Sequence, residues 1–264
     1  MSREDRDKWN ARYAEGAYAD RTHPSPLLEE WLPRLEVSAA SPRAVDIACG
    51  NGRNALFLAR NGWQVDAVDI SDVALQNLAR SAEDESLAVQ CVAADLESAE
   101  PIPGPILPPQ AYDLAIMFRY ANLPLLKRVG ASLKPGGYLI VEAHLQTDAE
   151  VIGPGSARFR LAPGALRAAA GELAVVDYSE GLVVDPDGRL AHWRDWWRAQ
   201  SARRHRCAIG AGSVLHMGMA SSLRNIRCRN PAQKTFLDCA ANASHRVYIL
   251  PRGPISGPRP NRPA

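Results

Sequence analysis

Short apolar runs alternate with amphipathic stretches through most of the chain. The apolar runs have the length and composition of buried strands, and we expect strands at residues 45–48, 63–69, 87–92, 112–118, 138–143 and 174–182. Apolar side chains at helical spacing predict helices at residues 53–61, 71–82, 123–133 and 163–170. Strands that alternate with helices form a parallel sheet covered on both faces. The pattern therefore predicts an α/β fold with a Rossmann-like, doubly wound, mostly parallel sheet.

Two further helices are expected ahead of this pattern. Residues 5–14 are amphipathic, with Trp9 and Tyr13 one helical turn apart. Two prolines in the stretch 23–26 interrupt the chain before a second helix at about residues 26–35. We treat residues 1–40 as an N-terminal helical segment and residues 41–190 as the main domain.

A glycine turn between the first strand and the first helix of the main domain carries the clearest functional signal. Asp46 lies inside the apolar strand, and Gly50 and Gly52 follow it in the sequence Asp-Ile-Ala-Cys-Gly-Asn-Gly-Arg-Asn. Glycine lets a ligand approach the backbone closely. The helix that begins after the turn offers unpaired N–H groups and the positive end of its dipole. This arrangement predicts a site for a nucleotide-like cofactor.

The glycines alone do not identify that cofactor. They also satisfy the loose Gly-x-Gly-x-x-Gly/Ala pattern of NAD(P)-binding oxidoreductases, which is a weak signal without its context. Asp46 discriminates better, because a carboxylate beside the turn would repel a pyrophosphate and attract a cation. S-adenosylmethionine has an ammonium and a sulfonium and no phosphate. The turn therefore favours S-adenosylmethionine over a dinucleotide.

Two more carboxylates follow the next two predicted strands. Asp69 ends the second strand, where an acid can accept hydrogen bonds from both hydroxyls of a ribose. Asp95 follows the third strand and could accept a hydrogen bond from the adenine amino group. The carboxyl ends of parallel strands meet at one edge of a sheet, so the three acids are expected to line one crevice.

On these residues the chain resembles the class I S-adenosylmethionine-dependent methyltransferases, in the small-molecule branch that includes tellurite-resistance and thiopurine-type enzymes. The similarity covers residues 1 to about 190 and is greatest over residues 46–69. A Lys-Pro-Gly-Gly turn at residues 134–137 matches a later landmark of that family. Ala48 stands where the family often has glycine, and alanine takes little additional space. The resemblance implies S-adenosylmethionine as the methyl donor and a methyltransferase activity. It also implies that the helices of residues 1–40 lie over the cofactor crevice as a lid, with a simple packing helix as the alternative.

The resemblance also implies which residues hold the donor. Asp46 and the turn would bind the methionine part, Asp69 the ribose, and Asp95 with Leu96 the adenine. The candidate cofactor-binding residues are Asp46, Ala48, Cys49, Gly50, Asn51, Gly52, Asp69, Ile70, Asp95, Leu96 and Phe118.

The chemistry is expected where the fourth strand ends, at Arg119 and Tyr120. The Asn/Asp-Pro-Pro-aromatic motif of adenine-methylating enzymes and the Pro-Cys pair of cytosine-methylating enzymes are both absent there. Arg119 and Tyr120 would suit a small polar or anionic acceptor, and His144 is a candidate general base. The sequence leaves the nucleophile open among sulfur, selenium or tellurium, oxygen and nitrogen.

The composition of the chain indicates in which cellular compartment the protein is expected. No apolar run approaches the roughly 20 residues of a membrane span. The charged N-terminus does not resemble a secretory signal, and five cysteines without a Cys-x-x-Cys pair suit a reducing compartment. We therefore expect a cytoplasmic protein that uses no metal, and the sequence leaves its oligomeric state open.

The charge changes sharply near residue 190. Residues 1–190 carry 18 Lys/Arg and 27 Asp/Glu, whereas residues 191–264 carry 13 and 2. A turn at residues 185–190 should lead into an apolar seventh strand, but Trp193, Trp196 and Trp197 stand there among charges. We therefore expect strand seven to be missing or degraded and residues 191–264 to be a disordered basic tail.

A slip of the reading frame would explain the missing strand. Moved back by one base, residues 192–198 would read x-Leu-Ala-x-Leu-Val-Ala, provided that the arginine codons are CGN. This hypothesis places the slip near Leu190 or Ala191, and the coding DNA tests it, because it fails if that frame is not open. If the tail is native, it is instead a basic arm that would suit a nucleic-acid methyltransferase. A binding module without catalysis is the remaining alternative.

Overall fold

The structure is a computed structural model in which residues 3–97, 107–148, 154, 156–171, 173–183 and 242–250 are described. All of these residues belong to one compact unit, which comprises residues 1–194 and 240–264. The second unit, residues 195–239, lies outside the described residues.

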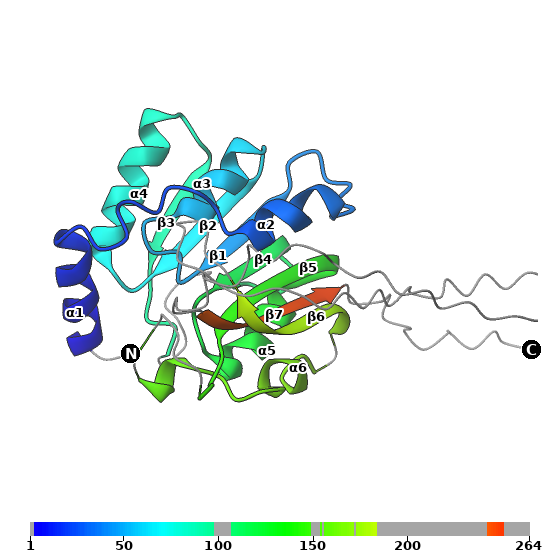
Figure 1. The fold of residues 1–264 in the computed structure, drawn as a ribbon. Helices are drawn as coiled ribbons and strands as arrows, with labels where there is room; N and C mark the ends of the chain where they lie inside the picture. The colour runs from blue at the N-terminus through cyan, green and yellow to red at the C-terminus, as the bar shows by residue number, and fades with distance from the viewer. Residues whose placement is uncertain are drawn as a thin grey trace, which may run out of the picture. The chain divides into compact units, whose positions relative to one another are not determined.

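A seven-stranded sheet in the order β3-β2-β1-β4-β5-β7-β6 forms the centre of this unit (Figure 1). Strands β1 to β5 are parallel to one another, whereas β7 runs antiparallel to both of its neighbours. The strands are β1 (Arg43–Ile47), β2 (Gln64–Asp69), β3 (Val89–Ala93), β4 (Tyr112–Phe118), β5 (Leu133–His144), β6 (Ala174–Val183) and β7 (Asn242–Leu250). The predicted fold class, a Rossmann-like α/β fold with a mostly parallel sheet, is confirmed.

Helices cover both faces of the sheet, with α2, α3 and α4 on one face and α5 and α6 on the other (Figure 1). The helices are α1 (Arg3–Ala14), α2 (Pro26–Trp31), α3 (Arg53–Arg60), α4 (Asp72–Asp84), α5 (Leu123–Ser132) and α6 (Ala165–Ala168), with short 3-10 turns at Leu32–Arg34 and Ala157–Phe159. None of the helices in the described residues has both the length and the apolar character needed to span a membrane.

The two cores lie on opposite faces because side chains alternate along each strand. In β1, Val45 and Ile47 pack in the core that includes residues of α5, and Ala44 packs in the core that includes residues of α3. Alternation directs Asp46 to the same face as Ala44. A carboxylate thus lies at the carboxyl end of a buried strand, beside the start of α3.

The expectation that strand seven is missing or degraded is wrong. Asn242–Leu250 pairs with β5 on one side and with β6 on the other. The sequence pattern predicts this strand directly after residue 190, although the entropic cost of a longer connection grows only slowly with its length. Residues 242–250, part of the tail expected to be disordered, form the strand instead. The remainder of the tail, including residues 192–198 of the frame-slip hypothesis, lies outside the described residues.

The order of the strands reverses at β1, which has β2 on one side and β4 on the other. In open α/β sheets a crevice forms outside the carboxyl ends of the strands at such a switch point. The loop after β1 lies there, and it contains the glycine turn.

The glycine turn needs Gly52 for two reasons. Gly52 has a φ of +76°, a conformation that side chains with a Cβ disfavour. A Cβ on Gly52 would also lie only 2.2 Å from Cδ1 of Leu78, which is fully buried in α4. The turn is therefore fixed both by its own backbone and by the packing of α4 against it.

We predict that Gly52→Ala lowers the free energy of unfolding by at least about 2 kcal/mol, because backbone strain and overpacking add. Gly62→Ala is the matched control: Gly62 has a φ of +83°, and a Cβ there would meet nothing within 4 Å. Gly62→Ala should lower the free energy of unfolding by only about 1–2 kcal/mol, because it strains the backbone without overpacking. Urea unfolding of both variants measures the difference, and equal losses would contradict the packing argument.

Candidate functional site

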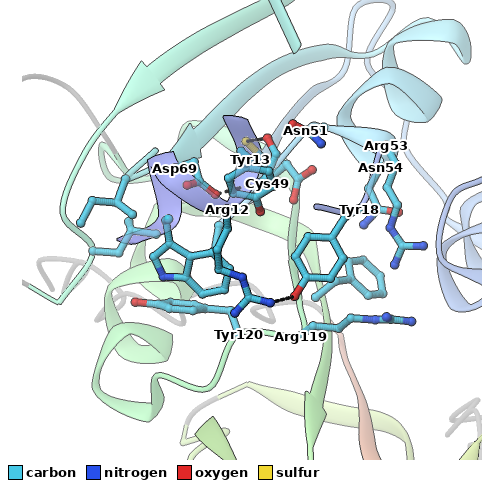
Figure 2. Close-up of a pocket in the computed structure, with 18 of the residues that line it drawn as sticks. Arg12, Tyr13, Tyr18, Cys49, Asn51, Arg53, Asn54, Asp69, Arg119 and Tyr120 are labelled. Carbon is cyan, nitrogen blue, oxygen red and sulfur yellow. Dashed lines mark hydrogen bonds between the residues drawn. The ribbon is translucent and has the colours of Figure 1, made fainter. Parts of the chain in front are cut away.

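A cavity of about 520 Å³ opens at the carboxyl ends of β1, β2, β4 and β5. Its volume falls in the usual range for small-molecule sites. Every residue named above as a cofactor-binding or catalytic candidate lines this cavity, except Asp95. Figure 2 shows Asp69 and Cys49 toward one end of the cavity and Arg119 and Tyr120 toward the other.

Asp46 lines the cavity with only 2% of its surface exposed. The backbone N–H of Ala55, in the first turn of α3, donates a hydrogen bond to its carboxylate. The second oxygen, Oδ2, is buried and has no hydrogen-bond partner within the described part of the chain. A buried carboxylate oxygen without a donor is costly, so this atom indicates where a cationic or hydrogen-bond-donating ligand would be stabilised.

Asp69, at the end of β2, is held by the glycine turn. The backbone N–H of Gly50 donates to its Oδ2 over 2.8 Å, and the N–H of Ser71 donates to its Oδ1 over 2.9 Å. Burial nevertheless raises the pKa of Asp69 above its usual value, and these two hydrogen bonds oppose that effect. Ser71 also caps α4 by accepting a hydrogen bond from Ala74, as its position before that helix predicts.

The two carboxylates disfavour each other's charge. Burial raises the pKa of Asp46 to about 8, and the negative charge of Asp69 adds to that effect. Arg53, the first residue of α3, opposes it. At neutral pH, Asp46 is therefore largely protonated unless a positive charge enters the cavity.

Three cavity residues other than glycine have positive φ angles: Tyr18 at +63°, Ala48 at +56° and Arg119 at +59°. For alanine, this conformation costs about 1–2 kcal/mol relative to the right-handed regions. The substitution of alanine for the family's glycine thus has a conformational cost, which the sequence analysis considered only as a question of space. Strained backbone of this kind is frequent at ligand-binding positions.

Asp95 does not line the cavity, although Leu96 and Ala94 on either side of it do. Its carboxylate accepts a hydrogen bond from the backbone N–H of Glu97 over 2.9 Å, which forms a local turn. The adenine contact expected of Asp95 therefore stays a prediction, and Leu96 lies at the cavity wall.

The opposite end of the cavity is formed by the residues that follow β4 and β5. Nε of Arg119 lies 3.9 Å from Oε1 of the buried Glu142, and the backbone N–H of Arg119 donates to the carbonyl of Glu142. Asn122, the cap of α5, donates to the Tyr120 hydroxyl over 3.2 Å. Burial raises the pKa of Tyr120, so its hydroxyl stays protonated. His144, the last residue of β5, is 8% exposed and lines the cavity.

Helix α1 and the loop that follows it contribute lining residues that the sequence pattern does not predict. Lys8, Trp9, Arg12, Tyr13, Tyr18 and Arg21 all line the cavity. No residue of α1 is buried, so helical periodicity alone could not place the helix. The one available signal was the spacing of Trp9 and Tyr13, whose rings lie 6.0 Å apart.

Six further lining residues were not predicted: Arg53, Asn54, Ala94, Ala121, Pro154 and Phe159. Arg53 also donates to the carbonyl of His23 over 3.2 Å, and Asn54 accepts from the backbone N–H of Ser25 over 2.8 Å. These two bonds tie the segment between α1 and α2 to the start of α3. In the described residues, no group of three or more acids, histidines or cysteines has the geometry of a metal site.

The segment that carries the glycine turn and the two acids is similar to a known protein family. Residues 44–137 match the model of a methyltransferase domain family. That segment extends from β1 to the glycine pair of residues 136–137, so it contains the glycine turn and both carboxylates. The fold is that of the class I methyltransferases.

One curated relative and two solved structures extend the comparison. Trans-aconitate 2-methyltransferase of Paracidovorax citrulli is 31% identical over 136 residues, which is 51% of this chain and 49% of that protein. The chain thus covers about half of that relative. TehB from Haemophilus influenzae superposes with a TM-score of 0.54 at 16% identity, over 90% of this chain and 66% of that one.

The second solved structure concerns the conversion of a disulfide bond into a thioacetal group during echinomycin biosynthesis. It has a TM-score of 0.51 at 14% identity, over 89% of this chain and 84% of that one. Both structural likenesses concern the fold.

We predict that Asp46→Asn stabilises the empty protein at alkaline pH. The pKa of Asp46 is raised in the folded state, so folding retains a proton that the unfolded chain releases near pH 4. Its contribution to stability is therefore lost as the pH rises from about 4 to about 8. Asparagine removes this dependence, so the variant should be at least about 1 kcal/mol more stable than the parent at pH 9.

Urea unfolding at pH 5, 7 and 9 measures this difference, which should grow with pH. Asp84→Asn, at the exposed end of α4, is the control and should follow the parent. If the difference in the free energy of unfolding between the parent and Asp46→Asn stays constant from pH 5 to pH 9, the buried-charge argument is contradicted.

Proposed function

We propose that this protein transfers a methyl group from S-adenosylmethionine to a small-molecule acceptor. The observation that carries the proposal is the buried Oδ2 of Asp46, which lacks a hydrogen-bond partner among the described residues and lies in a cavity beside a second buried carboxylate. A ligand with a positively charged end would supply the missing donor and offset the repulsion between Asp46 and Asp69.

The residues of the cavity fit this donor from end to end. Asp46 would accept hydrogen bonds from the ammonium group, and the bare backbone of the glycine turn would lie against the methionine part. Asp69, already oriented by Gly50 and Ser71, retains lone pairs that can accept from the ribose hydroxyls. Leu96 and Phe118 offer apolar surface for the adenine. When bound, the donor supplies an electrophilic methyl group on a sulfonium that leaves as a neutral thioether.

The residues after β4 and β5 would orient the acceptor. An in-line displacement depends chiefly on alignment, which fixed side chains can provide. The Tyr120 hydroxyl, protonated because of burial, would act as a hydrogen-bond donor and not as a base. His144 would remove a proton from an oxygen or nitrogen nucleophile, whereas a sulfur, selenium or tellurium nucleophile would need little such help. Trans-aconitate, which the name of the curated relative gives as its acceptor, is a small molecule, and this favours the same class here.

The alternatives have less support. A nicotinamide oxidoreductase would bring a diphosphate to the turn, where Asp46 and Asp69 would oppose it. A nucleic-acid methyltransferase would rely on the basic tail, most of which lies outside the described residues.

We also propose that the N-terminal segment acts as a lid. In support, α1 has no buried residue, is tied to α4 by hydrogen bonds from Ser71 and Val73 to Asn10, and forms one wall of the cavity.

Donor binding tests the proposal directly. In isothermal titration calorimetry, S-adenosylmethionine should bind the parent and NADH should not. Asp46→Asn should weaken donor binding by about tenfold to one hundredfold, because a charge-assisted hydrogen bond is lost. Asp84→Asn should bind as the parent does. Tight NADH binding without any heat from S-adenosylmethionine would overturn the proposal.

A further inference from the structure

Two arginines lie against one tyrosine ring on the cavity wall. The guanidinium carbon of Arg12 lies 5.7 Å from the ring centre of Tyr18, and that of Arg21 lies 5.2 Å from the same ring. Arg12 also stacks over Trp9 at 5.1 Å and donates to the Tyr18 hydroxyl over 3.0 Å (Figure 2). We call Arg12, Tyr18 and Arg21 the arginine clamp.

The backbone at Tyr18 is strained to form this arrangement. Tyr18 has a φ of +63°, which is rare for a bulky side chain and has an energetic cost. Tyr18 is nevertheless 36% exposed, so its burial does little to offset that cost. This backbone conformation places the ring beside two cations on the cavity wall. Strained positions of this kind are frequent where a protein clamps a ligand.

Arg12 is oriented but not neutralised. Among the residues that the structure describes, it makes no ion pair with a carboxylate. Its guanidinium carries five N–H donors in a rigid plane, and the hydroxyl of Tyr18 occupies one of them. The two flanking rings hold the plane of the guanidinium, so little side-chain entropy remains to be lost on binding. A planar, oriented guanidinium is matched in geometry to a carboxylate.

Arg34 shows that stacking alone does not produce this arrangement. It lies over the ring of Trp31 at 5.3 Å, but its guanidinium is paired with Glu30 at 3.1 Å, and it lies outside the cavity.

Arg43 and Arg158 are likewise stacked on aromatic rings and paired with carboxylates outside the cavity. Arg167 lies over Tyr178 at 5.5 Å without an ion pair among the described residues, but it too lies outside the cavity. Arg12 is distinguished by its place on the cavity wall, where a ligand can supply the carboxylate.

We infer that the arginine clamp binds a carboxylate group of a ligand in the cavity. This inference rests on the proposed function, because the cavity would then hold two carboxylate sources. One is the amino-acid end of the donor, and the other is an organic-acid acceptor. Lys8 and Arg119 line the same cavity and extend its positive charge, which suits an anionic acceptor.

The test compares ligands with and without the carboxylate in the parent and in Arg12→Gln. The donor arm uses S-adenosylmethionine and its decarboxylated analogue in calorimetry. The acceptor arm uses tricarballylate and its neutral triamide, measured by binding in the presence of S-adenosylhomocysteine. Arg12→Gln should weaken binding of the acid by about tenfold or more in one arm, and should leave binding of the counterpart without the carboxylate unchanged. The arm that responds identifies the source of the carboxylate.

Two further variants keep the test sharp. Arg34→Gln removes a stacked arginine outside the cavity and should bind all four ligands as the parent does. Tyr18→Phe keeps the ring and removes the hydroxyl that orients Arg12, so it should reproduce a smaller part of the same selective loss. Arg12 and Tyr18 are exposed, so melting temperatures should stay near that of the parent.

The inference is overturned if the parent binds S-adenosylmethionine but Arg12→Gln does not selectively weaken binding of the acid in either arm. A loss that is equal for ligands with and without the carboxylate would also overturn it, because the effect would then not depend on the carboxylate. A parent that fails to bind S-adenosylmethionine would instead refute the proposed function, so the two failures are distinguishable.

Discussion

The structure of the site depends on two carboxylates that are buried at the ends of adjacent parallel strands. Neither Asp46 nor Asp69 forms an ion pair among the described residues, and burial together with mutual repulsion makes the charged form of Asp46 unfavourable. Folding alone gains nothing from such a pair, because buried acids without a cation destabilise a protein. The pair is therefore best understood as a binding site whose cation is supplied by a ligand.

The surrounding fold maintains this pair in place. The reversal of strand order at β1 opens a crevice beside Asp46, and the glycine turn lets Gly50 donate to Asp69 across that crevice. Gly52 is held by Leu78, so α4 fixes the turn from behind. On the opposite side, α1 contributes cations and aromatic rings but no buried residue. The strands of the sheet thus present the acids, and the more exposed N-terminal segment presents Arg12 and Arg21.

Much of this could be predicted from local patterns. The bounds expected for β4 agree with Tyr112–Phe118, and the cap at Ser71, the acid in β1 and the acid at the end of β2 are all where the sequence placed them. These features depend on nearby residues and on the period of a strand or helix. The methyltransferase fold followed from the glycine turn and from the order of strands and helices.

The features that were missed depend on contacts between distant segments. Strand β7 follows β6 after a long connection, and nothing near residue 190 indicates where the partner of β5 will come from. Helix α1 was expected to be amphipathic but has no distinct apolar face and buries no residue, so only its tertiary position reveals that Arg12 and Tyr13 line the cavity. The positive φ angles of Ala48 and Tyr18 are likewise set by the surrounding structure, and the residue types alone do not predict them.

Proton release on donor binding is the most direct test of the central claim. Asp46, with a pKa of about 8 in the empty protein, is mostly protonated at pH 7 and must ionise to pair with an ammonium group. Calorimetry at pH 7 in two buffers with different ionisation enthalpies should therefore show release of about one proton for each S-adenosylmethionine bound. Tight binding with the same heat in both buffers would contradict the account.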